Sequence, residues 1–312
     1  MNIDLSEEAL AYGTSAGQAI ESAGGDRLLL AAEEDPRQRE SQYGPVLAEL
    51  GAWELDPRGD GDDLEAAAAL CRAAGYRAVA YPLAERLARP RDLDVDGLIV
   101  VPDRGPASAP VAGLPLRWAA VTLRGRRSLV TGARESGPPR TAAFAATLDL
   151  HGTDLADGAG DAALGLVLPC WTLLGLLDRA IDLTLAHVKV REQFGQPLSA
   201  FQGVQFQLTE AEVERTGLDV LAKYALWSIQ AGNREAAQDA LALRMAALEA
   251  AEVVFRAAHQ LHGAMGFCDE TPLSWLSRYS QPIRRAPFGL SATRALLAER
   301  IGRPGARAGG DR

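Results

Sequence analysis

The stretch REQFGQPLSAFQ, residues 191–202, lies between two long apolar helical patterns and decides how they pack. Gly195 and Pro197 break the helical period, because glycine readily adopts a positive φ and proline cannot donate a helical hydrogen bond. A short connection between long helices places them antiparallel. The stretch therefore predicts a helical hairpin, and its arginine, glutamines and phenylalanine are more than a surface turn needs.

Long helices are predicted on both sides of this break. Apolar residues recur at steps of three and four after Asp161, which predicts a helix of about 28 residues that ends near Val188. Further helices are predicted over residues 201–228, 235–261 and 291–301. Together these helices predict an antiparallel bundle.

Before the bundle, the sequence pattern changes once, from helical to strand-like. Residues 1–92 show helical patterns broken by glycine and proline, and Ser6 followed by two glutamates starts the first helix. Residues 93–160 hold short runs rich in Val, Leu and Thr, which are typical of strands in a small antiparallel sheet or barrel. The predicted fold is α+β and mostly helical, with a helical N-terminal domain (1–92), a reduced β-domain (93–160), a C-terminal helical bundle (161–302) and a disordered tail (303–312).

Composition excludes several classes of protein. Acidic residues outnumber basic ones by 41 to 32, a net charge of −9, which argues against a nucleic-acid partner. No uninterrupted apolar run approaches the roughly 20 residues of a membrane span, and no signal peptide is apparent, so we expect a cytoplasmic protein. Three cysteines without CxxC spacing, and His259 with His262 without a third ligand, give no reason to expect a disulfide framework or a metal site.

Two stretches carry residues suited to binding. Arg191 offers a planar fork for a phosphate, and Gln193 and Gln202 add neutral donors and acceptors. Phe194 can anchor the turn or cover a ring. The plainer interpretation is that Arg191 bonds the carbonyl groups at the helix end.

The second stretch is HQLHGAMGF, residues 259–267. Gly263 and Gly266 flank Ala264 and Met265, which leaves backbone that a flat or charged group can approach closely. The plainer interpretation of this stretch is a helix C-cap.

Taken together, the two stretches and their order resemble the acyl-CoA dehydrogenase family, with RxQFGxPLxxFQ followed two long helices later by QLHGxxG. The resemblance is clear across about 165–301 and covers 1–160 only in outline. It implies a helical N-terminal domain, a middle β-domain and a C-terminal four-helix bundle. It also implies FAD, a CoA thioester substrate, and a dimer or tetramer with FAD at a subunit interface.

The resemblance also implies a set of contact residues for the ADP part of an FAD that a neighbouring subunit mainly holds. Ala264 stands where the family usually has a glycine, a small change that keeps the backbone approach. The implied residues are Arg191, Gln193, Phe194, Gln202, Gln260, Leu261, His262, Gly263 and Ala264.

A catalytic carboxylate is absent from both places where the family has one. Desaturation of a thioester needs a carboxylate to remove the α-proton while a hydride moves to the flavin. Phe288 fills the place before the terminal helix, and Gly165 fills the place on the first bundle helix. We therefore predict no catalytic residue in this chain. Asp161, one helical turn before Gly165, is the alternative base, and its plainer role is at the helix start.

The middle region also departs from the family, because GRRSLVTGARESGPPRTAAF, residues 125–144, contains no flavin-binding loop. Trp118 is better explained as a strand core residue than as the family's flavin-lining tryptophan. These losses predict a non-catalytic subunit, similar to the smaller chains of actinobacterial enzymes that desaturate CoA thioesters of steroid side chains.

In this hypothesis, a full-length acyl-CoA dehydrogenase homologue supplies the base, the acyl-CoA site and the flavin ring site, in an α2β2 complex that passes electrons to an electron-transfer acceptor. Two alternatives stay open. One is a self-sufficient flavoenzyme that uses an unrecognised carboxylate such as Asp161, and the other is a flavin-free scaffold or regulatory protein.

Overall fold

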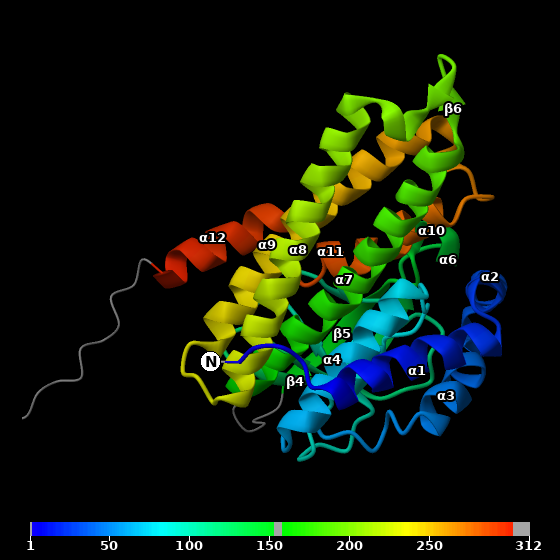
Figure 1. The fold of residues 1–312 in the computed structure, drawn as a ribbon. Helices are drawn as coiled ribbons and strands as arrows, with labels where there is room; N and C mark the ends of the chain where they lie inside the picture. The colour runs from blue at the N-terminus through cyan, green and yellow to red at the C-terminus, as the bar shows by residue number, and fades with distance from the viewer. Residues whose placement is uncertain (1, 153–157, 302–312) are drawn as a thin grey trace, which may run out of the picture.

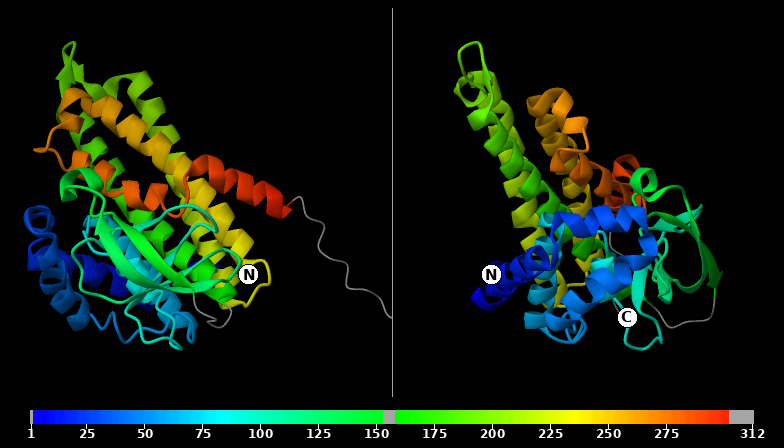
Figure 2. Two further views of the ribbon diagram at one scale, coloured as in Figure 1. Left: turned by 180° about the vertical axis from the view of Figure 1, so that it is seen from behind. Right: turned by 90° about the vertical axis from the view of Figure 1, so that its right-hand side faces the viewer.

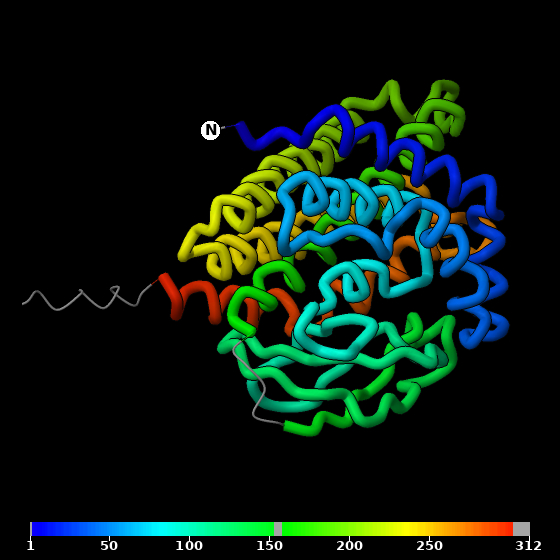
Figure 3. The backbone as a smooth tube through the Cα atoms, turned by 90° about the horizontal axis from the view of Figure 1, so that it is seen from below, coloured from blue at the N-terminus to red at the C-terminus, as the bar shows by residue number. Residues whose placement is uncertain are grey.

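The computed structural model describes residues 2–152 and 158–301, and the chain folds into helices around a small sheet (Figure 1). The predicted α+β, mostly helical class is confirmed. The tail predicted for residues 303–312 lies outside the described residues. In Figure 3 the strands gather on one side of the molecule, away from α8.

The N-terminal segment is helical. Its helices are α1 (Glu7–Ala23), α2 (Asp26–Glu34), η1 (Pro36–Gln38), α3 (Arg39–Glu49), α4 (Gly61–Tyr76) and α5 (Leu83–Leu87). Ser6 caps α1, as predicted, because its side chain accepts a hydrogen bond from the Ala9 amide at 3.3 Å. The sequence analysis missed α2, because the Gly24-Gly25 pair that ends α1 leads directly into a new helix.

Five strands form one sheet. They are β1 (Gly97–Val100), β2 (Ala107–Ala109), β3 (Trp118–Val121), β4 (Arg127–Glu135) and β5 (Ala146–Gly152), in the order β1-β3-β4-β5-β2. The prediction of an antiparallel sheet is wrong for β1 and β3, which pair in parallel because the chain passes through β2 before it returns. One of the strand-like runs begins at residue 141 in the sequence. The strand itself begins only at Ala146, because the short helix α6 (Pro139–Ala142) and two residues with positive φ precede it.

Three long helices build the C-terminal bundle: α7 (Ala159–Val190), α8 (Gln202–Gln230) and α9 (Ala236–His262). The terminal helix α12 (Leu290–Ile301) packs on α9. The sequence analysis missed α10 (Pro272–Tyr279) and α11 (Gln281–Arg285) in the connection before α12. By length and composition alone α7 could cross a membrane, and 78% of its most apolar window is buried inside the protein, as in a core helix.

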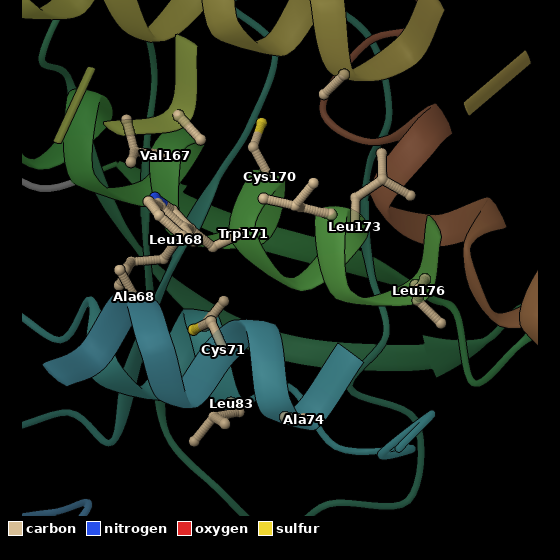
Figure 4. Close-up of a cluster of buried hydrophobic side chains, with 14 of the residues drawn as sticks. Ala68, Cys71, Ala74, Leu83, Val167, Leu168, Cys170, Trp171, Leu173 and Leu176 are labelled. Atoms are coloured by element: carbon tan, nitrogen blue, oxygen red, sulfur yellow. The ribbon is translucent and has the colours of Figure 1, made fainter. Parts of the chain in front are cut away.

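The helices of the N-terminal segment and the bundle share one apolar core. Figure 4 shows part of it, where Trp171 and Leu168 of α7 face Ala68 and Cys71 of α4. Trp171, Leu168 and Cys71 have no exposed surface. The two helices therefore form a single packed layer.

Two glycines let the backbones of α4 and α7 touch. A Cβ at Gly175 would lie 1.9 Å from the Arg72 carbonyl oxygen, and a Cβ at Gly75 would lie 2.0 Å from the Thr172 carbonyl oxygen. Real side chains do not approach backbone atoms so closely. The crossing of α4 and α7 thus requires glycine on both helices.

We predict that Gly175→Ala lowers the free energy of unfolding by about 3 kcal/mol or more, because the backbones must separate to admit the methyl group. The matched control is Gly217→Ala on α8, where nothing lies within 4 Å of the added Cβ. Alanine there should raise the free energy of unfolding by about 0.5–1 kcal/mol through helix propensity. Urea unfolding measures both, and equal effects at the two positions would contradict the close crossing.

Candidate functional site at the tip of the bundle

The stretch 191–202 forms the far end of the bundle (Figure 2). After α7 come the two short strands β6 (Glu192–Gln193) and β7 (Gln196–Pro197), then η2 (Leu198–Ala200). The Leu198 amide donates to the Arg191 carbonyl at 2.8 Å and closes the base of this hairpin. The predicted reversal between two antiparallel helices is therefore present, in the form of a small hairpin.

Phe194 sits in a costly conformation at the hairpin turn. Its φ is +52° and that of Gly195 is +80°, a pattern in which Asn-Gly is the favoured pair. A bulky residue in the left-handed region costs on the order of 1 kcal/mol or more. The ring is nevertheless 93% exposed and touches only the edge of Phe201, with centroids 6.3 Å apart. The strained backbone at Phe194 therefore leaves its apolar ring exposed to solvent.

The polar residues of the hairpin also face outward. Arg191, Gln193 and Gln202 are exposed. Within the described part of the chain, the Arg191 guanidinium forms no hydrogen bond or ion pair. Arg191 itself is the C-cap residue of α7 through its backbone. The plainer interpretation, a side chain that bonds helix-end carbonyl groups, is therefore not what the structure shows.

The second stretch lies next to the first. The rings of His187, one turn before Arg191, and His262 stack with centroids 4.4 Å apart. Burial lowers the pKa of both imidazoles, which favours the neutral form of each ring. Gly263, at φ +63°, is the C-cap of α9, which bears out the plainer interpretation of this stretch. The fold thus brings together two motifs about 70 residues apart in sequence.

Most residues of the second stretch are accessible. Gln260, Gly263 and Ala264 are exposed and His262 is half-buried, at the start of η3 (Gly263–Phe267). Leu261 is buried, so its side chain cannot contact a molecule bound outside the bundle. Gln260 and Gly263 also border a surface hollow of about 520 Å³, together with Arg256, His259, Phe267 and Arg284.

Neither place where a base was missing offers a carboxylate, and the place at Gly165 is also tightly packed. A Cβ at Gly165 would lie 2.6 Å from Val100 Cγ2 in the sheet, so even a methyl group displaces its neighbour. The Phe288 carbonyl accepts a hydrogen bond at 2.8 Å from Arg244, which is 1% exposed. The cavity that Gly165 borders has a volume of about 30 Å³, which is room for about two water molecules.

Both carboxylate oxygens of Asp161 take part in ion pairs within the fold. One carboxylate oxygen pairs with Arg58 Nη1 at 2.5 Å and the other with Arg127 Nη2 at 2.6 Å. Asp161 and Arg127 are both buried. Because both oxygens face guanidinium groups, the carboxylate is bonded on both sides and does not face a substrate cavity. Asp161 therefore joins α7 to the sheet and to the loop before α4.

Trp118 is 3% exposed and packs with residues of β1, β2 and β5 on one face of the sheet. A Cβ at Gly97, its partner in the β1–β3 register, would lie 2.4 Å from the indole ring. The ring therefore fills the sheet core, in agreement with the interpretation of Trp118 as a strand core residue.

One buried carboxyl group escaped the sequence analysis. Glu85 of α5 borders the same cavity as Gly165 and an adjoining cavity of about 60 Å³. Among the described residues, no other side chain forms a hydrogen bond or ion pair with it. Burial raises the pKa of the Glu85 carboxyl to about 7. Sequence gave no signal, because a glutamate on a short polar helix ordinarily faces water.

Comparison with known proteins defines the class. Residues 167–296 match the model for "Acyl-CoA dehydrogenase, C-terminal domain". Acyl-CoA dehydrogenase FadE27 of Mycobacterium tuberculosis is 31% identical over 137 residues, which are 42% of this chain and 36% of that protein. The 3-sulfinopropanoyl-CoA desulfinase of Paraburkholderia xenovorans is 36% identical over 107 residues, 34% of this chain and 26% of that protein. The chain thus spans only about a quarter to a third of the curated relatives that it matches.

Solved structures match nearly the whole chain. The "Tcur3481-Tcur3483 steroid ACAD G363A variant" has a TM-score of 0.77 at 22% identity and covers 95% of this chain and 98% of its own. The ChsE4-ChsE5 complex of M. tuberculosis has a TM-score of 0.72 at 18% identity, with coverages of 97% and 100%. These likenesses show the α+β fold described above.

Residues 167–296 of the bundle are therefore similar to the C-terminal domain of acyl-CoA dehydrogenases. This likeness agrees with the resemblance that the two sequence motifs suggested, and FAD is the cofactor of the acyl-CoA dehydrogenase family.

We predict a pH-dependent contribution of Glu85 to stability. Its folded pKa of about 7 lies above its ordinary value of 4.5, so the stability it contributes is complete below pH 4.5 and is lost as the pH rises through 7. Relative to Glu85→Gln, the free energy of unfolding of the wild type should fall by on the order of 3 kcal/mol across that range. The exposed Glu210→Gln should leave the wild-type profile unchanged, and a parallel profile for Glu85→Gln would contradict the buried carboxyl.

Proposed function

We propose that this chain is a non-catalytic subunit of a heteromeric FAD-dependent acyl-CoA dehydrogenase. It contributes contacts to the ADP half of FAD, and a full-length homologous partner supplies the catalytic carboxylate. The observation that carries the proposal is the bundle tip, where the exposed Arg191 guanidinium has no partner among the described residues and the Phe194 ring is 93% exposed.

The tip fits an ADP group. The Arg191 guanidinium is free to form paired charge-assisted bonds with a phosphate, and the exposed Phe194 ring can cover the adenine. Gln260 adds a neutral donor and acceptor next to Gly263, whose backbone has nothing within 4 Å of the Cβ position. When bound, FAD supplies the hydride acceptor. This chain's residues bind and orient its ADP end.

The closed interior supports a non-catalytic role. Ligand pockets that hold molecules of this size usually have volumes of some 300–1,000 Å³, at least about ten times that of the cavity of about 30 Å³ beside Gly165. The backbone before α12 is held by Arg244 and offers no carboxylate at Phe288. The acyl-CoA substrate therefore binds mainly on the partner.

A partner chain is supported by where apolar surface is exposed. The tip and the outer face of α8 carry most of the large exposed apolar side chains, and on α8 three of them recur at seven-residue steps. These residues are Val190, Phe194, Phe206, Val213, Val220, Leu221, Met265 and Phe267. A seven-residue repeat is the pattern with which one helix packs on another.

The names of similar proteins suggest the substrate. One structural neighbour is described as a steroid ACAD and another as a complex of two chains. By analogy, we extend the proposal to an α2β2 complex that acts on the CoA thioester of a steroid side chain and passes electrons to an electron-transfer acceptor.

The self-sufficient flavoenzyme and the flavin-free scaffold are the two alternatives to this proposal. A self-sufficient enzyme that uses Asp161 is disfavoured, because two arginines occupy that carboxylate. A flavin-free scaffold would keep the bundle and its partner surface, and the flavin content of the complex separates it from the proposal.

Purification with the partner chain should give a complex with one FAD per pair of chains, because only one member of each pair has a closed interior and no flavin loops. Absorbance at the flavin band against protein concentration measures this ratio. A ratio of two would show that this chain holds a flavin of its own, and a ratio of zero would favour the scaffold. This chain purified alone should be colourless and inactive on acyl-CoA.

Arg191→Ala should weaken FAD retention by about 2 kcal/mol, roughly thirtyfold in the dissociation constant, through the loss of charge-assisted phosphate bonds. The matched control is Lys189→Ala, which removes an exposed cation two residues earlier on the same helix end. Flavin release monitored by fluorescence gives both constants. Equal losses in the two variants would mean that only the general positive charge matters, and no loss for Arg191→Ala would remove it from the site.

A further inference from the structure

Two adjoining cavities meet at Glu85. The larger, of about 60 Å³, lies between the loop 78–82, α5, α7 and the connection before α11. The smaller, of about 30 Å³, reaches from Glu85 to Gly165 and Arg244. Glu85 and four apolar residues border both, namely Pro110, Pro169, Pro282 and Ile283.

The walls are apolar except at a few points. Leu83 and Leu176, labelled in Figure 4, line the larger cavity. Thr172 also lines it, and its hydroxyl donates to the Leu168 carbonyl at 3.4 Å and forms a hydrogen bond with the Cys71 thiol. The Glu85 carboxyl is the strongest hydrogen-bonding group on the walls that has no partner among the described side chains. A carboxyl so placed carries a desolvation cost that a bound polar group would relieve.

The charged side chains on the cavity walls limit the class of ligand that can bind. Arg39 lines the larger cavity and Arg244 the smaller, and both are buried and bonded to backbone carbonyl groups, without a carboxylate in an ion pair. Two buried cations disfavour a third, so an ammonium ligand is unsuited. An anionic ligand would find few donors, because most N–H groups of the two guanidinium groups already bond backbone carbonyl oxygens. What remains is a neutral, mainly aliphatic molecule that can donate one hydrogen bond.

We infer that these cavities form a binding site for a small neutral aliphatic alcohol, whose hydroxyl hydrogen-bonds to the Glu85 carboxyl while its chain lies among Leu83, Leu176 and Ile283. A cavity of about 60 Å³ holds about five water-sized groups, which matches a four-carbon alcohol. The site is separate from the bundle tip and does not depend on the flavin, on a partner chain or on the proposed subunit role.

The test is a titration of the full-length chain with 1-butanol, followed by the ¹³C methyl resonance of Ile283. A saturable shift is expected at Ile283, which borders both cavities, and none at Ile229 near the end of α8, which serves as the internal reference. Glu85→Leu removes the carboxyl and fills the space, and should weaken binding at least tenfold. Glu85→Gln keeps a hydrogen-bonding group of the same shape and should stay within threefold of the wild type.

Each other outcome overturns the site. Shifts that do not saturate, or that are equal at Ile229, would mean that water alone fills the cavities and that butanol acts as a cosolvent. Saturable binding of 1-butylamine in preference to 1-butanol would assign the cavities to cations and contradict the charge argument. Binding that survives in Glu85→Leu would show that the carboxyl does not take part. Neither flavin content nor partner binding enters the measurement, so failure here leaves the proposed function untouched.

Discussion

The contact between α4 and α7 is the constraint on which the rest of the structure depends. Two glycines, Gly75 and Gly175, let each helix rest against a carbonyl group of the other, and the apolar core of both helical segments is built around that contact. A polar cluster continues it at the surface, where Arg72 of α4 pairs with Asp178 of α7 and with Asp219 of α8. The long axis of α7 is thereby fixed against two neighbours.

The fixed position of α7 determines both of its ends. At its start, Asp161 is clamped by Arg58 and Arg127, which ties the helix to the sheet and presses Gly165 against Val100. At its far end, α7 extends beyond the N-terminal helices and presents the β6–β7 hairpin to solvent (Figure 2). The same packing that closes the interior therefore projects the tip.

Much of this could be predicted from the sequence. Helical periodicity gave the three long helices to within a few residues, because long amphipathic segments carry the strongest signal. The short helices α10 and α11 and the parallel pairing of β1 with β3 were missed, because they depend on contacts distant in sequence. The tip residues were predicted as one group from the family resemblance, and the stacking of His187, just before the first motif, on His262 of the second places the two motifs close together.

The burial and the ion pairing of individual polar groups could not be predicted from the sequence. Asp161 seemed available as a base, and only the fold brings in Arg58 and Arg127, which lie about 100 and 34 positions away. Glu85 was not singled out from the sequence, and only the fold places it beside the two cavities. Charge pairing and burial of this kind are set by tertiary contacts, which local patterns do not encode.

The strained turn at the tip raises the question of why position 194 is a phenylalanine. Asn at position 194 would relieve the positive φ, and a polar side chain there would avoid exposing a ring, so stability and solubility both favour replacement. Phenylalanine offers this isolated chain only an edge contact with Phe201. The proposed subunit role would account for such a residue, because a bound cofactor and a partner subunit would cover the exposed ring. The contacts that the described chain gives Phe194 do not account for it.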